Sequence, residues 1–346
     1  MDNFEEQLEM LQNQFDKTYG EGTFSDISRI TDYQQEILHT TPSLDLGLNG
    51  GLSEGSWITL TGPPKTGKSV FALTLAAEAQ KQGRIIFYAD VEARLKRKNL
   101  DIEGLDLSPQ KFKLIRSTEE KLLSGVDFLN QIICILETIP RAMVIIDSVS
   151  SLAEKKEMEE GVEAETRGNI NKKISSFVRC AGQAVTVNKS YVVGITQRIA
   201  NVTGYGKSQL EKAGYAWRHQ RDCCLFIKKS EPWTIEDKRS VTGLKEIGKK
   251  VTWVVEESIL GAPGAEVQTY LRYGFGYDKK FEIFQLAIGL GIINKAAAGG
   301  WITIPQLSNK KIQGEEKAFN LLCSNAEVYE EINSKVMKFL TGQEDE

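Results

Sequence analysis

The sequence predicts an α/β fold built on a central, mostly parallel sheet with helices on both faces. Short runs rich in β-branched and aromatic residues recur along the chain, and helical segments separate the first four of them. Parallel neighbours need a long crossover, usually a helix, so this alternation indicates a parallel sheet. A composition of 41% hydrophobic and 26% charged residues is ordinary for a globular protein. The expected strands are 57–61, 84–89, 142–146, 191–196, 223–228, 251–256 and 267–272, the late ones as an antiparallel extension.

Residues 1–37 are expected to form a helix followed by a short extended piece. Phe4, Leu8, Leu11 and Phe15 lie at spacings of four, three and four, which places them on one face of a helix over 4–15. A lone helix must bury such an apolar stripe. The sequence leaves open whether the stripe packs on the chain's own core or on a neighbouring subunit.

The core is expected to span 38–279, followed by a small α+β C-terminal domain at 280–346. From about Lys280 the pattern changes to helices around a strand pair at Gly300–Ile304. Within the core, the stretches 154–168 and 198–214 are polar, contain glycine and show no clear period. Long irregular loops in a compact domain are usually functional or disordered, so both are candidate binding loops.

Charge and residue counts argue against several classes of protein. A formal net charge of −4 disfavours an all-over basic coat, although it leaves open a basic inner groove. No apolar run reaches the roughly 20 residues of a membrane helix, and the N-terminus is acidic rather than signal-like. The five cysteines lack metal-ligand spacing, and two histidines disfavour a histidine metal site or a catalytic triad. We therefore expect a cytoplasmic protein without a membrane partner.

A phosphate-binding loop stands between the expected strand 57–61 and an expected helix over 70–77. The stretch 62–69 matches the pattern G-x-x-x-x-G-K-[ST] in full. Glycines let backbone N–H groups turn toward a phosphate, and the following helix adds its positive end. Lys68 would reach the β- and γ-phosphates of ATP, and the Ser69 hydroxyl would bind Mg²⁺. The predicted contacts in this loop are Gly62, Pro63, Pro64, Lys65, Thr66, Gly67, Lys68, Ser69 and Val70.

Two carboxylates are expected beside this loop. The apolar strand 142–146 ends at Asp147, which can hold Mg²⁺ through water; alone, such a residue is more often an ordinary strand end. The strand 84–89 delivers Asp90 and Glu92 to the same edge of the sheet. We predict Glu92 as the base that activates the attacking water, the alternative being a solvated acid at a strand end.

These residues together resemble the RecA family over nearly the whole chain. The stretch 39–52 is similar to the segment that leads into that family's first core strand, and 90–93 resembles its catalytic-glutamate stretch. Residues 145–152 are similar to its second Mg²⁺ motif, and Gln197 falls where the family has a glutamine that senses the γ-phosphate. The divergence between the motifs is more like that of phage-encoded RecA/UvsX-like proteins.

The resemblance implies a helical filament on single-stranded DNA that pairs this strand with a homologous duplex. ATP would lie between subunits, and the N-terminal helix would pack on the adjacent subunit. Tyr273 matches an aromatic residue near the base. The stretches 154–168 and 198–214 look like the family's two DNA-binding loops, although a charge on a surface helix is as often merely solvated. The predicted DNA contacts are Arg167, Lys172, Arg179, Arg198, Gly204, Gly206, Lys207 and Gly214.

The sequence also departs from the family's pattern. Glu256 and Ser258 stand where the family often has lysines that reach the neighbouring subunit's γ-phosphate, and Arg218, Lys249 or Lys250 are the candidate replacements. Two other functions share this core: a hexameric ring ATPase or helicase, and a regulatory RecA-like module that does not bind DNA. The N-terminal segment favours the filament, and the charged loops disfavour the regulatory module.

Overall fold

The computed structural model describes residues 2–153, 169–200, 209–237 and 239–341, and the chain divides into two compact units, Met1–Glu36 and Ile37–Glu346. The first unit contains α1 (Asp2–Tyr19) and α2 (Ser28–Thr31). The expected helix over 4–15 is thus confirmed and is longer at both ends. Phe15 packs edge-to-face on Phe24, with ring centroids 5.4 Å apart, whereas Phe4 is 66% exposed.

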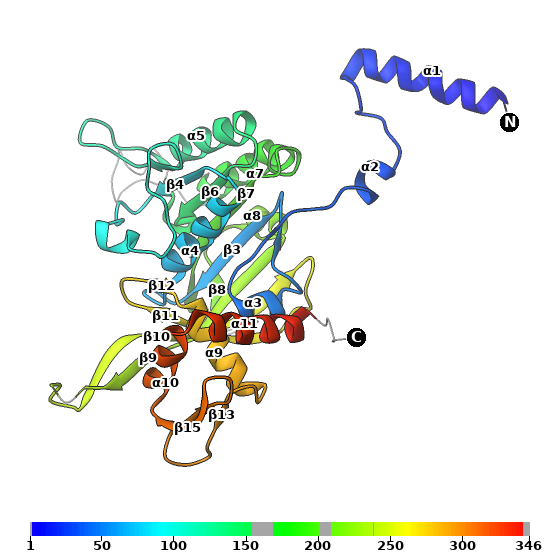
Figure 1. Cartoon of the computed structure of the whole chain (residues 1–346). Helices are drawn as coiled ribbons and strands as arrows, with labels where there is room; N and C mark the ends of the chain where they lie inside the picture. Colours follow the sequence, from blue (N-terminus) through cyan, green and yellow to red (C-terminus); the bar gives the residue numbers. More distant parts are fainter. Residues whose placement is uncertain (1, 154–168, 201–208, 238, 342–346) are drawn as a thin grey trace. The chain divides into compact units, whose positions relative to one another are not determined.

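The second unit is built on a large, mostly parallel sheet, as the sequence predicts (Figure 1). Its strand order is β12-β11-β10-β9-β3-β7-β6-β4-β5, and β8 pairs with β7 off this path. Strands β9, β3, β7, β6, β4 and β5 run parallel, and β10, β11 and β12 continue the sheet in antiparallel pairs. The bounds are β3 (Trp57–Gly62), β4 (Ile86–Asp90), β5 (Phe112–Ile115), β6 (Met143–Asp147), β7 (Tyr191–Ala200), β8 (Gln209–Glu211), β9 (Cys223–Glu236), β10 (Leu244–Ser258), β11 (Glu266–Arg272) and β12 (Gly276–Tyr277).

Side chains alternate between two hydrophobic clusters, one on each face of the sheet. In β6, Met143 and Ile145 pack in the cluster that holds α4 (Lys68–Lys81), whereas Val144 and Ile146 pack in the cluster that holds α5 (Gly125–Thr138) and α7 (Asn169–Val187). A strand buried on both faces is apolar throughout, which is why the sequence shows it as a continuous run. The helices α5 and α7 lie side by side on their face of the sheet.

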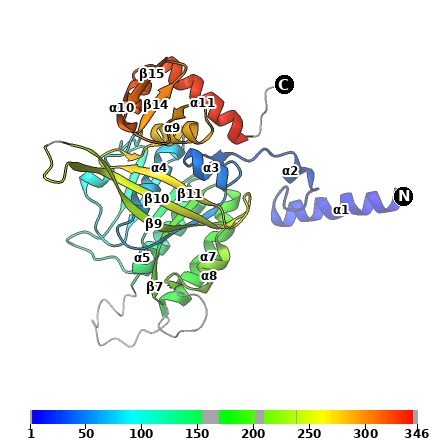
Figure 2. The ribbon, with the colours of Figure 1, turned by 90° about the horizontal axis from the view of Figure 1, so that it is seen from below.

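The C-terminal part of this unit gathers at one end of the core (Figure 2), around a third hydrophobic cluster that it shares with Trp233 of β9 and Tyr270 of β11. It contains α9 (Lys279–Gly289), α10 (Glu315–Cys323), α11 (Ala326–Thr341), and the strands β13 (Asn294–Lys295), β14 (Trp301–Ile304) and β15 (Ser308–Gln313). The sequence predicted a strand pair, and the structure corrects this to three antiparallel strands. The polar residues of β13 and β15 show no alternating or apolar pattern, so the sequence does not predict these two strands. Among the described residues, no helix is long and apolar enough to cross a bilayer.

A buried carboxyl joins this C-terminal part to the start of the core. The backbone N–H of Ser43, in the first turn of α3 (Pro42–Gly47), donates to Oε1 of Glu282 at 2.5 Å. Glu282 lies on α9 and is 1% exposed. Burial raises the pKa of its carboxyl to about 7, and the hydrogen bond from Ser43 offsets part of that rise.

Replacement of Glu282 by glutamine should therefore stabilise the protein at alkaline pH. The native chain keeps the Glu282 proton up to about pH 7, whereas the unfolded chain loses it near the ordinary glutamate pKa of 4.5. The wild type consequently loses stability as pH rises across this window, by on the order of 2 kcal/mol. Urea denaturation at pH 5 and pH 8 should show Glu282→Gln gaining on the wild type only at the higher pH. The control, Glu327→Gln at an exposed site, should show no such gain, and an equal gain of Glu282→Gln at both pH values would contradict the assignment.

Candidate active site

The phosphate loop connects β3 to α4 at the carboxyl edge of the parallel strands. Its backbone takes positive φ at Gly62 (+145°), Lys65 (+60°) and Gly67 (+110°). A Cβ atom at Gly62 would lie 3.0 Å from the carbonyl oxygen of Ile227, so a side chain there meets backbone as well as strain. The loop ends at the N-terminus of the 14-residue helix α4, a ready site for an anion.

Lys68 lies at the centre of this loop and is buried. Its Nζ donates to the carbonyl oxygens of Gly62 at 2.9 Å and Pro63 at 2.6 Å. Burial lowers the pKa of its ammonium group to about 8, against the opposing effect of the nearby carboxylates of Asp147 and Glu92. An anionic phosphate in the loop would favour the charged form of this group.

Asp147 provides oxygen atoms suited to Mg²⁺. Its Oδ2 accepts hydrogen bonds from the hydroxyls of Ser69 at 2.6 Å and Tyr88 at 2.5 Å. Burial raises the pKa of its carboxyl, an effect that a nearby cation would offset. No group of three or more acidic, histidine or cysteine side chains gathers to hold a metal in the described part of the chain. Mg²⁺ keeps several waters and takes one or two protein ligands plus phosphate oxygens, and Ser69 and Asp147 are the residues that would hold it here.

Glu92 is held in a defined orientation at the same edge of the sheet. Its Oε1 accepts hydrogen bonds from Ser148 at 2.9 Å, Ser151 at 2.7 Å and Nε2 of Gln197 at 3.3 Å. Its Oε2 pairs with the exposed guanidinium of Arg94 at 3.1 Å. The backbone brings these groups together because β4, β6 and β7 are adjacent parallel strands.

Asp90 has a different role from Glu92. Its carboxylate accepts hydrogen bonds from the backbone N–H groups of Arg94 at 3.0 Å and Leu95 at 3.1 Å, and the residue is 3% exposed. Asp90 thus fixes the turn that carries Glu92.

A cavity of about 470 Å³ opens over these groups, and the predicted nucleotide contacts line it except for Gly62 and Pro63. The phosphate loop from Pro64 to Val70 lines it, together with Glu92, Asp147, Gln197 and Tyr273. Tyr273 is half exposed, and its hydroxyl is hydrogen-bonded to the Glu246 carboxylate.

The structure adds residues to this cavity that sequence reasoning did not place there. Lys249, considered earlier as a cross-subunit residue, donates from Nζ to the carbonyl oxygen of Lys65 in its own phosphate loop at 2.7 Å. Tyr88 lies within an apolar strand, so the sequence pattern predicts a core residue at this position. Ser148 and Ser151 belong to the stretch 145–152, but their spacing alone does not predict that both hydroxyls contact Glu92.

Apart from Arg198, the predicted DNA-binding residues fall into three groups. Lys172 and Arg179 are exposed on α7 and, seven residues apart, share one helix face. Gly214 lies immediately before α8 (Tyr215–Gln220), with φ of +76°. The remaining loop residues, Arg167, Gly204, Gly206 and Lys207, lie outside the described residues.

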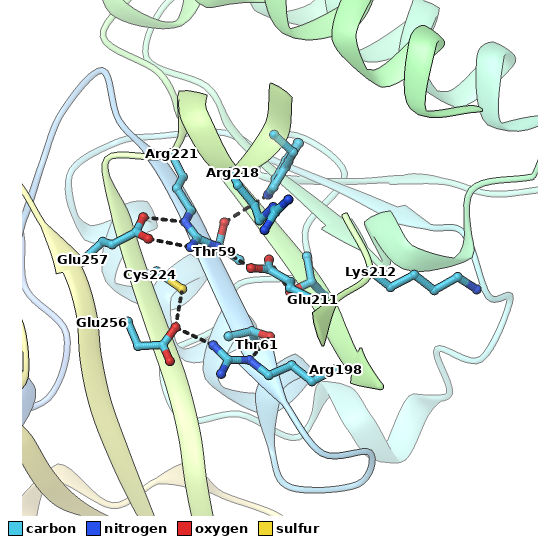
Figure 3. Close-up of polar contacts among 12 residues, drawn as sticks. Thr59, Thr61, Arg198, Glu211, Lys212, Arg218, Arg221, Cys224, Glu256 and Glu257 are labelled. Carbon is cyan, nitrogen blue, oxygen red and sulfur yellow. Dashed lines mark hydrogen bonds and ion pairs between the residues drawn. The ribbon is translucent and has the colours of Figure 1, made fainter. Parts of the chain in front are cut away.

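Arg198 differs from the other predicted DNA contacts because its side chain interacts with other residues of the protein (Figure 3). It forms an ion pair with Glu256, and its guanidinium lies 3.9 Å from the ring centroid of Phe226. The side chain is 12% exposed. In this conformation Arg198 does not offer its charge to a DNA phosphate, contrary to the sequence-based expectation; the sequence showed the charge but not its partner.

Comparisons with known proteins identify the family of this chain. A family model described as the RecA N-terminal domain matches residues 6–278. The chain belongs to the RecA family. It is 27% identical to Protein RecA of Campylobacter fetus over 97% of this chain and 93% of that protein, and 26% identical to Protein RecA of Thermus aquaticus over 97% and 95%. A crystal structure of the RadB recombinase shares the fold, with a TM-score of 0.50 and 19% identity, covering 70% of this chain and 98% of that one.

The arrangement predicts that binding and hydrolysis of ATP can be separated by mutation. Glu92→Gln keeps the shape of the side chain but removes the base, so we expect it to bind ATP and to hydrolyse it at least about 100-fold more slowly. Lys68→Ala should abolish binding itself. Equilibrium binding of a fluorescent ATP analogue and release of phosphate measure the two steps. The exposed Glu119→Gln serves as the control, and turnover of Glu92→Gln at the wild-type rate would exclude Glu92 as the base.

Proposed function

We propose that the chain is an ATP-dependent DNA recombinase that forms helical filaments on single-stranded DNA and catalyses homologous pairing and strand exchange. Membership of the RecA family supports the broader statement, a nucleotide hydrolase of recombination and repair. The phosphate loop, Asp147 and Glu92 support ATP with Mg²⁺ as the nucleotide that it hydrolyses to ADP and phosphate.

The position of Gln197 is the observation that carries this proposal. Its side chain donates to the Glu92 carboxylate, and its backbone pairs with Gly62 at the start of the phosphate loop. The next residue begins the predicted second DNA-binding loop, 198–214. Gln197 therefore contacts the Glu92 carboxylate and directly precedes the predicted DNA-binding segment. Through this residue, binding of nucleotide and binding of DNA can influence each other.

The proposed reaction uses groups already in place. Lys68 and the backbone N–H groups of the loop bind the triphosphate. Glu92 orients the attacking water and accepts its proton as the oxygen bonds to the γ-phosphorus and ADP leaves. Ser69 and Asp147 would hold Mg²⁺, which supplies neutralisation of the phosphate charge. Gln197, close to Glu92, would contact the γ-phosphate, and Tyr273 would lie against the base.

The proposed DNA and subunit surfaces lie on separate parts of the chain. Lys172 and Arg179 would contact backbone phosphates, which gives binding without sequence preference, as pairing of any homologous sequence requires. We propose residues 1–37 as the oligomerisation segment, 38–279 as the ATPase core and 280–346 as a small C-terminal domain. The exposed stripe of α1 supports the first assignment, because apolar side chains such as Phe4 would be covered by a neighbouring subunit.

Single-stranded DNA should raise the rate of ATP hydrolysis, and electron microscopy should show extended helical filaments on that DNA. Charge removal at Lys172 and Arg179, both to glutamine, should weaken DNA binding and lower its salt dependence, whereas Lys81→Gln on α4 should change neither. Closed six-membered rings that unwind forked duplexes would favour the ring motor instead. ATP binding without any effect of DNA would favour the regulatory module.

A further inference from the structure

We infer that Ser150 is a positioning residue that links the hydrolytic carboxylate of Glu92 to the ribbon formed by β7 and β8. This inference rests on the proposed function, because the ribbon is the described part of the predicted second DNA-binding loop. The link is a single hydroxyl group, so it can be removed without touching Glu92, the phosphate loop or any exposed basic residue.

Three serines of one short turn face two different partners. The turn follows Asp147 directly and consists of Ser148, as the N-cap, and the 3₁₀ segment Val149–Ser151. Ser148 and Ser151 both donate to Oε1 of Glu92, at 2.9 and 2.7 Å. Ser150, between them, points to the ribbon instead: its hydroxyl accepts from the backbone N–H of Gln197 at 2.9 Å and donates to the carbonyl oxygen of Lys212 at 2.6 Å.

Ser150 therefore closes the base of the ribbon. The backbone N–H of Lys212 also donates to the carbonyl oxygen of Gln197 at 2.9 Å, so the two residues face each other across the two strands. Gln197 is the last residue of β7 that pairs with β3. Beyond it, the pairs formed by β7 within the described residues are with β8, from Arg198 opposite Glu211 to Ala200 opposite Gln209.

A second anchor holds the ribbon to the sheet but does not reach the active site. Arg221 pairs with Glu211 of β8 at 2.5 Å and with Glu257 of β10 at 2.6 Å (Figure 3). The hydroxyl of Thr196 donates to Glu211 at 2.9 Å. None of these four residues lines the described nucleotide cavity. This anchor fixes the position of the ribbon on the sheet. The Ser150 hydroxyl instead connects the ribbon to the turn 148–151, whose other two serines donate hydrogen bonds to Glu92.

The two hydrogen bonds of Ser150 make the ribbon and the turn move together. Ser150 is 9% exposed, so its hydroxyl has little access to water as an alternative partner. A displacement of Gln197 and Lys212 when DNA binds would shift the turn and, with it, the two hydroxyls on Glu92. Because coupling between two binding sites is reciprocal, nucleotide state would change DNA affinity through the same bonds.

The test compares Ser150→Ala with the wild type in the full chain. The quantity measured is the ratio of the dissociation constants of a fluorescent oligothymidylate with ADP and with a non-hydrolysable ATP analogue. Loss of this link should reduce the ratio about fivefold, the effect of one net hydrogen bond. ATP affinity and DNA-free hydrolysis should stay within about twofold of the wild type, while stimulation of hydrolysis by DNA falls.

Two further variants separate positioning from stability. Ser53→Ala is the matched control, because Ser53 is 8% exposed and its hydroxyl bonds that of Ser56, away from the ribbon. It should leave the ratio unchanged. Ser150→Cys replaces the hydroxyl by a somewhat larger thiol that is a weaker hydrogen-bonding group, and it should lower the ratio in the same direction as alanine.

The outcomes distinguish this inference from the proposed function. If the wild type binds ATP but DNA changes neither its hydrolysis rate nor its nucleotide binding, both the proposed function and the role of Ser150 are contradicted. A wild type that responds to DNA, with Ser150→Ala and Ser150→Cys responding equally, would overturn the role of Ser150 alone. If Ser53→Ala lowers the ratio of dissociation constants equally, the effect reflects general stability, and the role of Ser150 is also overturned.

Discussion

Parallel strands that end at one edge of the sheet are the constraint on which the site depends. Strands β3, β4, β6 and β7 deliver the phosphate loop, Glu92, Asp147 and Gln197 to the same edge, and register fixes their relative heights. Residues more than a hundred positions apart thus come within hydrogen-bond distance, as Gln197 does with Glu92. The helices on both faces exclude water from the strands beneath this edge.

Buried charge makes this edge suited to a charged ligand. Burial lowers the pKa of Lys68 and raises the pKa of the Asp147 carboxyl, so each ionised form is less favourable than it is in water. A triphosphate with Mg²⁺ would supply an anion for the ammonium group and a cation for the carboxylate. The buried guanidinium of Arg221, by contrast, is paired within the chain, with the buried Glu211 and the exposed Glu257.

Local pattern was sufficient to predict the doubly covered sheet, the phosphate loop and the carboxylates beside it, because each depends on an apolar run or a fixed spacing. Short polar strands such as β8 and β15 carry no such pattern, and they form because a partner strand is present. Arg198 shows the same limit: its charge is visible in the sequence, whereas its ion pair with Glu256 across the sheet is not. The divided roles of Ser148, Ser150 and Ser151 likewise depend on which strand end each hydroxyl meets.

The most direct test of the central claim, that this sheet edge is a nucleotide site, is calorimetric titration of the wild-type chain with a non-hydrolysable ATP analogue. With Mg²⁺ present, one saturable site per chain should appear, and chelation of the metal should weaken binding strongly. Absence of saturable binding in the presence of Mg²⁺ would contradict the account, because the loop, Lys68 and Asp147 would then have no ligand to hold.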